Sequence, residues 1–169
     1  MMKTWLKITL FCLSAFVFIG CDRVTKGFAK QHLKNKAPAS YFHNTVKLVY
    51  AENTGAAMGL GDELPKAESF WLLGILPLAF LLGTAAYTIR HSKEMHFRKI
   101  LSYALIISGG LGNIIDRIVY DRHVTDFMIF SIYEIQTGIF NFADVCVTAG
   151  AVGLLLFYRD KRTEKELVI

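Results

Sequence analysis

An apolar run without a single charged side chain covers residues 70–89, FWLLGILPLAFLLGTAAYTI. A helix needs about 20 predominantly apolar residues to cross a hydrocarbon core of about 30 Å. Pro77 lies inside the run, and membrane helices tolerate proline better than helices in water do. The stretch therefore predicts a transmembrane helix, and it places the chain among the integral membrane proteins.

Three further apolar runs accompany this one, at residues 8–20, 100–115 and 139–158. The chain has 169 residues, 53% of them hydrophobic, and a mean hydropathy of +0.38. Four such runs leave room for little beyond a bundle of helices. We therefore expect a mainly α membrane protein with four transmembrane helices, forming one domain over residues 1–169. The expected spans are approximately residues 5–22, 70–89, 99–117 and 139–158, and the outer segments are residues 27–69 and 118–138.

The distribution of lysine and arginine predicts the orientation in the membrane. Two positive charges lie in the N-terminal stub, four in residues 90–99 and four in the tail after Tyr158, whereas residues 118–138 contain only Arg122. Cytoplasmic loops carry an excess of Lys and Arg. Both termini are therefore expected in the cytoplasm, and both outer segments on the opposite side.

The outer segments have the composition of folded structure. Residues 46–50 and 128–135 are rich in β-branched and aromatic side chains, which is typical of strands. Residues 53–57 form a run of small residues, where the backbone can turn and approach a ligand closely. We expect a small extracytoplasmic β-containing cradle above the helices.

The predicted topology brings the unusual polar residues of the chain to the outer membrane face. They come from the outer ends of the first and third spans, from the outer segments and from the start of the last span. This convergence, which does not depend on their chemistry, predicts a functional site there. The residues are Asp22, Lys26, Asn53, Asn113, Asp116, Arg117, Asp126 and Asp144.

Asp126 and Asp144 are the catalytic candidates, because a charge at membrane depth costs roughly 2.5–3.5 kcal/mol on insertion scales. Two neighbouring carboxylates share a proton, so one can activate water while the other polarises a carbonyl group. The alternative makes Asp126 an ordinary loop residue and Asp144 a helix N-cap. Position alone favours this alternative for Asp126 and does not decide for Asp144.

The glycine-rich residues 109–117 also allow two readings. Asn113 and Arg117 are four residues apart and share a helix face, so Arg117 could hold a lipid phosphate or a substrate carbonyl. Alternatively, the glycines serve helix packing and the arginine extends toward the interface. Asp22 and Lys26, also four apart, have the spacing of a stabilising ion pair.

Composition argues against several classes of function. The net charge of +5 is not arranged as a basic stripe interleaved with aromatics, so no nucleic-acid partner is expected. Cys12, Cys21 and Cys146 have no disulfide or metal spacing, and no HExxH motif occurs, so we expect no metal and no cofactor. The segment before Cys21 is similar to a lipoprotein signal peptide, but Phe18 stands where leucine is usual and three spans follow. We interpret it as an uncleaved anchor.

Two other functions were weighed against hydrolysis. A proton-coupled transporter would need polar groups along the whole membrane path, whereas these carboxylates cluster at one face. A lipoprotein with a membrane-embedded body would be processed at Cys21, so a retained Met1 would exclude it.

Five motifs, in order along nearly the whole chain, resemble those of the bacterial lipoprotein signal peptidases (signal peptidase II). Arg23 stands where the family commonly has glutamine and Thr125 where it commonly has valine, and neither change touches the aspartates. The motifs are Asp22-Arg23-Val24-Thr25-Lys26, Asn53-Thr54-Gly55-Ala56-Ala57, residues 109–117, Val124-Thr125-Asp126-Phe127 and Phe140-Asn141-Phe142-Ala143-Asp144.

The resemblance implies an aspartyl endopeptidase of the bacterial inner membrane, with Asp126 and Asp144 as its dyad. Such enzymes remove the signal peptide of a diacylglyceryl-modified prolipoprotein by cleaving before the lipidated cysteine, and they are inhibited by globomycin. The implied partners are prolipoproteins, membrane lipids and globomycin-type inhibitors, and the expected state is a monomer. Asp116 belongs with the residues that shape the site because Asp116 and Arg117 could organise the outer end of the third span. That set is Asp22, Lys26, Asn53, Gly55, Asn113, Asp116, Arg117, Asn141 and Ala143.

Overall fold

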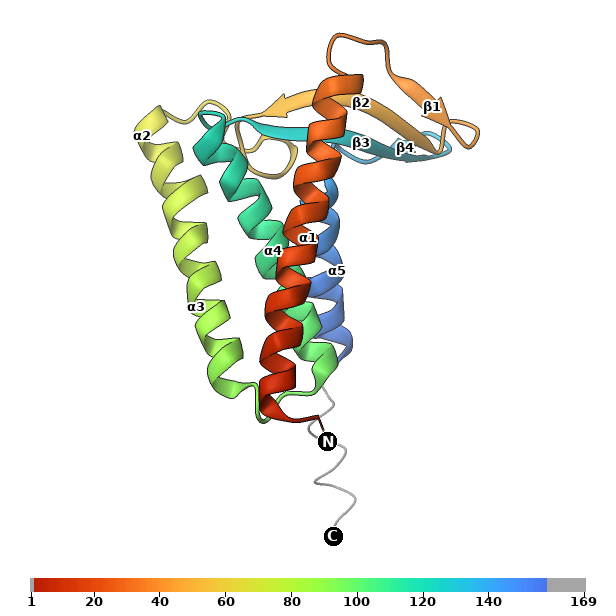
Figure 1. The fold of residues 1–169 in the computed structure, drawn as a ribbon. Coiled ribbons are helices and arrows are strands. Elements are labelled where there is room, and N and C mark those ends of the chain that lie inside the picture. Colours follow the sequence, from red (N-terminus) through yellow and green to blue (C-terminus); the bar gives the residue numbers. More distant parts are fainter. Residues whose placement is uncertain (1, 158–169) are drawn as a thin grey trace.

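The computed structural model describes residues 2–157, in which long helices run side by side and a small sheet lies across one end (Figure 1). A single-turn helix α2 (Lys66–Ser69) and a π-helical stretch (Phe70–Ile75) lead directly into α3. This architecture confirms the predicted mainly helical fold with a small β-structure. The long helices are α1 (Thr4–His32), α3 (Leu76–His91), α4 (Phe97–Val119) and α5 (Phe142–Leu156).

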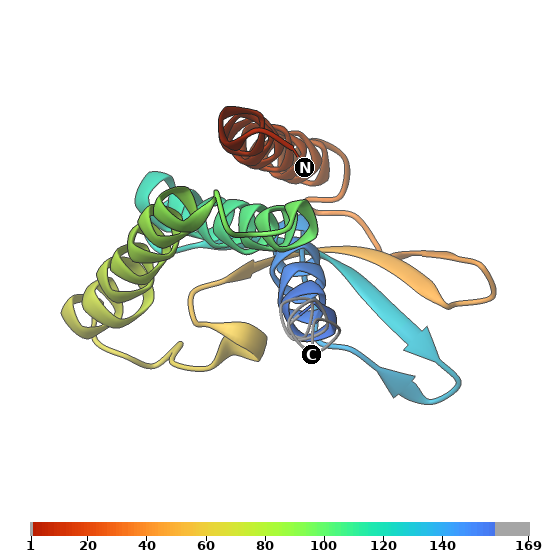
Figure 2. The ribbon, with the colours of Figure 1, turned by 90° about the horizontal axis from the view of Figure 1, so that it is seen from below.

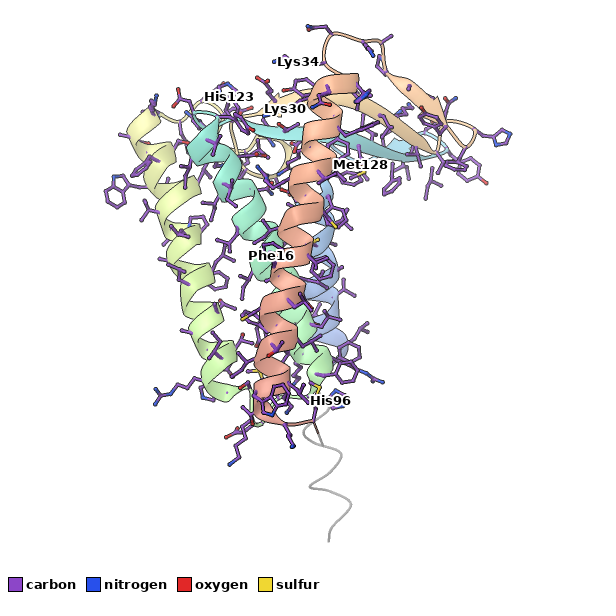
Figure 3. All side chains as sticks on the ribbon, viewed as in Figure 1. Phe16, Lys30, Lys34, His96, His123 and Met128 are labelled. Carbon is purple, nitrogen blue, oxygen red and sulfur yellow. The ribbon has the colours of Figure 1, made fainter. Side chains whose placement is uncertain are left out.

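Two helical stretches, Thr4–His32 and Lys66–His91, are long and apolar enough to cross a membrane. Only 11% of the apolar window in each is buried inside the protein. A soluble core helix would be mostly buried, so the exposed apolar side chains, such as Phe16 on α1, favour a lipid environment (Figure 3). α5 is apolar but shorter, and α4 does not reach the same hydropathy. Membrane crossing by α4 and α5 therefore stays a prediction.

α4 is the centre of the bundle and packs against α1, α3 and α5. Seen along the bundle, α1 and α5 lie on different sides of α4 (Figure 2). Gly112 allows both neighbours to approach, because a Cβ atom there would lie 2.7 Å from Asp22 Oδ2 on α1 and 3.3 Å from Ala143 Cβ on α5. The glycine-rich motif is thus a close-packing surface, as one of its two readings proposed.

The sheet is antiparallel with strand order β1-β2-β3-β4, and its strands confirm the two strand segments expected from composition. Its central pair is β2 and β3, with Asn53 opposite Val124 and Ala51 opposite Asp126. Asp126 is therefore a strand residue and does not lie in a loop. The strand bounds are β1 Ala39–Tyr41, β2 Val46–Asn53, β3 Val124–Ile132 and β4 Ile135–Gln136.

Several element ends differ from the approximate bounds expected from sequence. α1 continues to His32, past residue 22, so part of the first expected outer segment is helical. α5 begins at Phe142 and not at residue 139, because Phe140 still bridges to Met128 on β3. The last expected span includes Tyr158, which lies outside the described residues together with the basic tail that follows it.

Two of the histidines, His96 and His123, lie at opposite ends of the molecule. His96 lies at the end near the N-terminus, whereas His123 lies at the sheet end (Figure 3). Among residues 2–157, no group of three or more His, Cys, Asp or Glu side chains is placed to hold a metal ion.

Candidate active site

A cavity of about 490 Å³ lies where the sheet meets the helices. Six of the predicted site residues line it: Asn53, Asn113, Arg117, Asp126, Asn141 and Asp144. The rest of its wall is largely apolar and comes from α3, α4, α5, the segment after β2 and the segment that leads into α5. Among these wall residues are Ala56, Leu73, Pro77, Gly110, Ile139 and Val147.

Asp126 enters the cavity from β3 and is almost fully buried, with 3% of the residue exposed. Its two carboxylate oxygens accept hydrogen bonds from amides: Asn141 Nδ2 donates to Oδ1 at 2.6 Å and Asn53 Nδ2 donates to Oδ2 at 3.1 Å. Burial raises the pKa of Asp126 to about 6, and the negative charge of Asp144 acts in the same direction. Asp126 is thus a carboxyl group that can carry a proton near neutral pH.

Asp144 lies in the first turn of α5, where the helix dipole favours a negative charge. The N-cap itself is Asn141, whose side chain accepts from the Asp144 backbone N–H at 3.1 Å. In return, Asp144 Oδ2 accepts from the Asn141 backbone N–H at 3.0 Å, which completes a capping box. The other oxygen, Oδ1, accepts from Asn113 Nδ2 at 2.8 Å. The alternative that made Asp144 the N-cap is therefore wrong by three positions.

Two asparagine side chains connect the two aspartates. Asn141, which is fully buried, donates from Nδ2 both to Asp126 and to Asn113 Oδ1, the latter at 3.1 Å. Asn113 in turn donates to Asp144. A partly satisfied buried network is costly, whereas a connected one holds its members rigidly. The amides therefore hold both carboxylates at one cavity. Within residues 2–157 neither carboxylate forms a salt bridge, although both offset the charge of Arg117.

The neighbouring arginines hold the loop that follows β2. Arg117 lines the cavity and donates to Gly55 O at 2.6 Å. Gly55 is required at that point, because a Cβ atom would lie 2.6 Å from the backbone carbon of Gly59. Arg122 donates to the carbonyl oxygens of Thr54, Leu64 and Gly61 at 2.9–3.1 Å. Sequence reasoning missed this role, and its only signal was that Arg122 is the single basic residue in residues 118–138.

Four charged residues form a second polar group, on the α1 side of α4. Lys26 lies 3.1 Å from Asp22 and 2.9 Å from Asp116, and Arg23 lies 2.6 Å from each of these aspartates. None of the four lines the cavity. We call Asp22, Arg23, Lys26 and Asp116 the charge cluster.

The charge cluster supports the cavity through three contacts. On β3, Asp116 Oδ2 accepts from the backbone N–H of Thr125, the neighbour of Asp126, at 3.3 Å. Asp22 Oδ1 accepts from the backbone N–H of Ala143 at 3.1 Å, and Lys26 Nζ donates to Asn113 Oδ1 at 2.9 Å. Asp22, Lys26, Asp116, Gly55 and Ala143 thus lie behind the cavity wall, whereas the other predicted site residues lie on it. Arg23, a departure from the family pattern, joins both aspartates of the cluster.

Comparison with known proteins identifies the family. The family model for signal peptidase (SPase) II matches residues 14–159. The chain belongs to the signal peptidase II family. It is 40% identical to the lipoprotein signal peptidase of Chlorobaculum parvum, over 89% of this chain and 95% of that protein. The lipoprotein signal peptidase of Xylella fastidiosa is 30% identical, over 92% of this chain and 93% of the relative.

The fold of this peptidase is also similar to solved structures. A bacterial membrane enzyme determined by the in meso method at 2.3 Å has a TM-score of 0.76 and 25% sequence identity, with 94% of this chain and 92% of that chain covered. A second in meso structure of a bacterial membrane enzyme, at 1.9 Å, has a TM-score of 0.70 and 26% identity, over 88% of this chain and 92% of the other. The matches cover nearly the whole of this chain, so they include the residues of both the cavity and the charge cluster.

Proposed function

We propose that this chain is an intramembrane aspartyl endopeptidase that removes the signal peptide from diacylglyceryl-modified prolipoproteins, cleaving before the lipidated cysteine. The observation that carries the proposal is the pair Asp126 and Asp144, which line one cavity and accept hydrogen bonds from amide groups there. The relatives are named lipoprotein signal peptidases, which supports the choice of substrate.

In the proposed reaction the dyad begins with one proton. The oxygen of a water molecule attacks the scissile carbonyl carbon while Asp144 accepts a proton from that water. Asp126 gives its proton to the carbonyl oxygen, so a gem-diol forms. One hydroxyl then returns a proton to Asp126, Asp144 protonates the nitrogen, and the C–N bond breaks. The acid, the amine and the original dyad result. The raised pKa of Asp126 supports its role as the acid.

The other predicted residues position this pair. Asn53, Asn113 and Asn141 orient the carboxylates through the hydrogen bonds described above. Arg117 lines the cavity and is proposed to hold a substrate carbonyl. Asp22, Lys26, Asp116, Gly55 and Ala143 act behind the wall by holding the helices and the loop.

We further propose that all four long helices cross the bacterial inner membrane, with both termini in the cytoplasm and the cavity near the outer face. The sheet lies at the end of the bundle away from the N-terminus, which suits this orientation (Figure 1). A substrate anchored by its acyl chains would present its scissile bond at this depth, so membrane anchoring alone would bring the bond to the level of the two aspartates.

A cleavage assay tests the function. Purified protein in detergent receives a diacylglyceryl-modified prolipoprotein and, in parallel, the unlipidated precursor. We expect cleavage of the lipidated form only, inhibition by globomycin and no cleavage by Asp144→Asn. Mass spectrometry of the product must show the lipidated cysteine as the new N-terminus. No cleavage of either precursor by folded protein would refute the proposal and favour the transport reading.

A further inference from the structure

A second hollow, of about 550 Å³, lies between the start of α3 and the outer end of α4. Ile114 and Arg117 of α4 line both this hollow and the aspartate cavity, so the two adjoin. We call the second hollow the α3–α4 groove. Its lining consists of Lys66, Ser69, Phe70, Gly74, Ile75, Leu78, Ile114, Arg117, Ile118, Val119, Asp121 and Arg122.

Two polar atoms of residues that line this groove have no partner. Ser69 is 1% exposed, and among residues 2–157 its hydroxyl oxygen finds no hydrogen-bond partner. The Nε atom of Arg117 is likewise buried and unpaired within the described chain. A buried donor without an acceptor costs about 1–3 kcal/mol. Ser69 also precedes the π-helical stretch, a kind of helix distortion that is frequent at functional sites. A ligand with acceptor oxygens would satisfy these donors once the side chains that cover them shift.

The charges around the groove argue against a phosphate as that acceptor. Lys66 is paired with Asp121 at 2.7 Å, and both side chains are largely exposed. The guanidinium of Arg122 is already occupied by backbone carbonyl oxygens. The remaining lining is mostly apolar, with Phe70, Ile75 and other aliphatic residues. A neutral carboxylic ester with an attached hydrocarbon chain fits this combination better than a charged headgroup.

We propose that the α3–α4 groove holds an acyl ester, and the first part of its acyl chain, from the diacylglyceryl-cysteine of the substrate. This inference rests on the proposed function. The lipidated cysteine directly follows the scissile bond, so its glycerol must lie close to the dyad, and the groove adjoins the dyad's cavity at Ile114 and Arg117. Moving an acyl chain from the lipid into the groove gains little hydrophobic free energy, because both are apolar. The groove would instead contribute by positioning the scissile bond.

A matched pair of glycine substitutions tests the groove. Gly74 lines it, and a Cβ atom at Gly74 meets nothing within 4 Å, so Gly74→Leu adds a side chain at the groove without a clash at Cβ. Gly83 on the same helix also has nothing within 4 Å and lies outside the groove, so Gly83→Leu is the control. The substrates are two otherwise identical lipopeptides, one with dipalmitoylglyceryl-cysteine and one with diacetylglyceryl-cysteine.

We expect Gly74→Leu to lower kcat/KM for the dipalmitoyl substrate about tenfold, since misplacement of a reacting group by about 1 Å can cost up to 10²-fold. The short-chain substrate should be cleaved as by the unmodified protein, and Gly83→Leu should leave both rates unchanged. Equal losses on the two substrates, or no loss on the long one, would overturn the groove assignment.

A binding measurement separates failure of the groove from failure of the proposed function. Asp144→Asn protein is mixed with the dipalmitoyl lipopeptide carrying a diazirine near one ester, illuminated and mapped by mass spectrometry. We expect labels on residues 69–78, lost in the protein that also carries Gly74→Leu. If the unmodified protein cleaves neither lipopeptide, the proposed function fails, and the labelling still decides whether the groove takes the acyl ester. Labels spread evenly over the lipid-facing helices would reject the groove.

Discussion

The charge cluster and the cavity, on either side of α4, contain two aspartates each, but the partners of these aspartates differ. In the charge cluster, Asp22 and Asp116 are almost fully buried, and each lies within 3.1 Å of both Lys26 and Arg23. In the cavity, the hydrogen bonds that Asp126 and Asp144 accept from residues 2–157 come from amide groups. The paired carboxylates link α1 to α4, whereas the cavity carboxylates are held by hydrogen bonds from amides. A cationic partner thus distinguishes structural aspartates from catalytic candidates.

The largest expected effect follows from replacing a cavity aspartate. Asp126→Asn should lower kcat by about 10²–10⁴-fold, the usual contribution of an acid–base group, because the asparagine cannot donate a carboxyl proton. Thermal unfolding in detergent should change little, since Asp126 forms no salt bridge within residues 2–157 and Asp144 still offsets the charge of Arg117. The control is Glu134→Gln, which removes a negative charge in the exposed turn between β3 and β4, outside both the cavity and the α3–α4 groove, and should keep full activity. An Asp126→Asn protein that retains a tenth of the rate would break the comparison.

The charge cluster should respond in stability first. Lys26→Met leaves two buried aspartates with Arg23 as their one ion-pair partner among residues 2–157, and breaking a buried pair costs about 3–5 kcal/mol. Lys34→Met removes the exposed pair with Glu52, at 3.2 Å, and should cost about 0–1 kcal/mol. Unfolding curves of both variants test this difference. Equal unfolding temperatures for the two lysine variants would show that the cluster is not what holds α1 to α4.

Much of the fold follows from local pattern. Uninterrupted apolar runs predict the long helices, and β-branched content predicts the sheet, because each signal is contained in a short window of sequence. The element ends were less predictable. The strand β3 begins at Val124. Helix α5 begins only at Phe142, because the bridge between Met128 and Phe140 keeps the chain extended before it. The two bridged residues are too far apart in the sequence for their pairing to be read from a short stretch of it.

The candidate site residues were visible as polar residues at one membrane face, but their partners were not. Arg23 and Asp116 meet across 93 positions of sequence, and Asn141 reaches Asp126 from the turn before α5. Such contacts depend on how helices cross, and spacing along one helix does not encode them. The unpaired hydroxyl of Ser69 had no sequence signal either, because it results from burial beside the π-helical stretch.

The dependence of the aspartate cavity on the charge cluster can be tested at Gly112 of α4, which lies between them. Gly112→Ala places a methyl group 2.7 Å from Asp22 Oδ2 and 3.3 Å from Ala143 Cβ, so the start of α5 must move together with the cluster. Overpacking of this kind costs about 1–3 kcal/mol, and kcat should fall as well because Asp144 moves with α5. Gly20→Ala is the control, since nothing lies within 4 Å of a Cβ atom there. Loss of stability with full retention of kcat would show that the cavity is independent of the cluster.

The smallest expected effect concerns pH. Burial raises the pKa of Asp126 to about 6, so the proton needed by the acid is present below pH 6 and is lost above it. The kcat/KM of the free enzyme should therefore fall as pH rises through about 6, approaching tenfold, or about 1.4 kcal/mol, per pH unit. Such a profile reports the dyad as a pair. Unfolding temperatures at each pH serve as the control. A rate that climbs from pH 6 to pH 8 would instead place the essential base, and not the acid, on the group that titrates near pH 6.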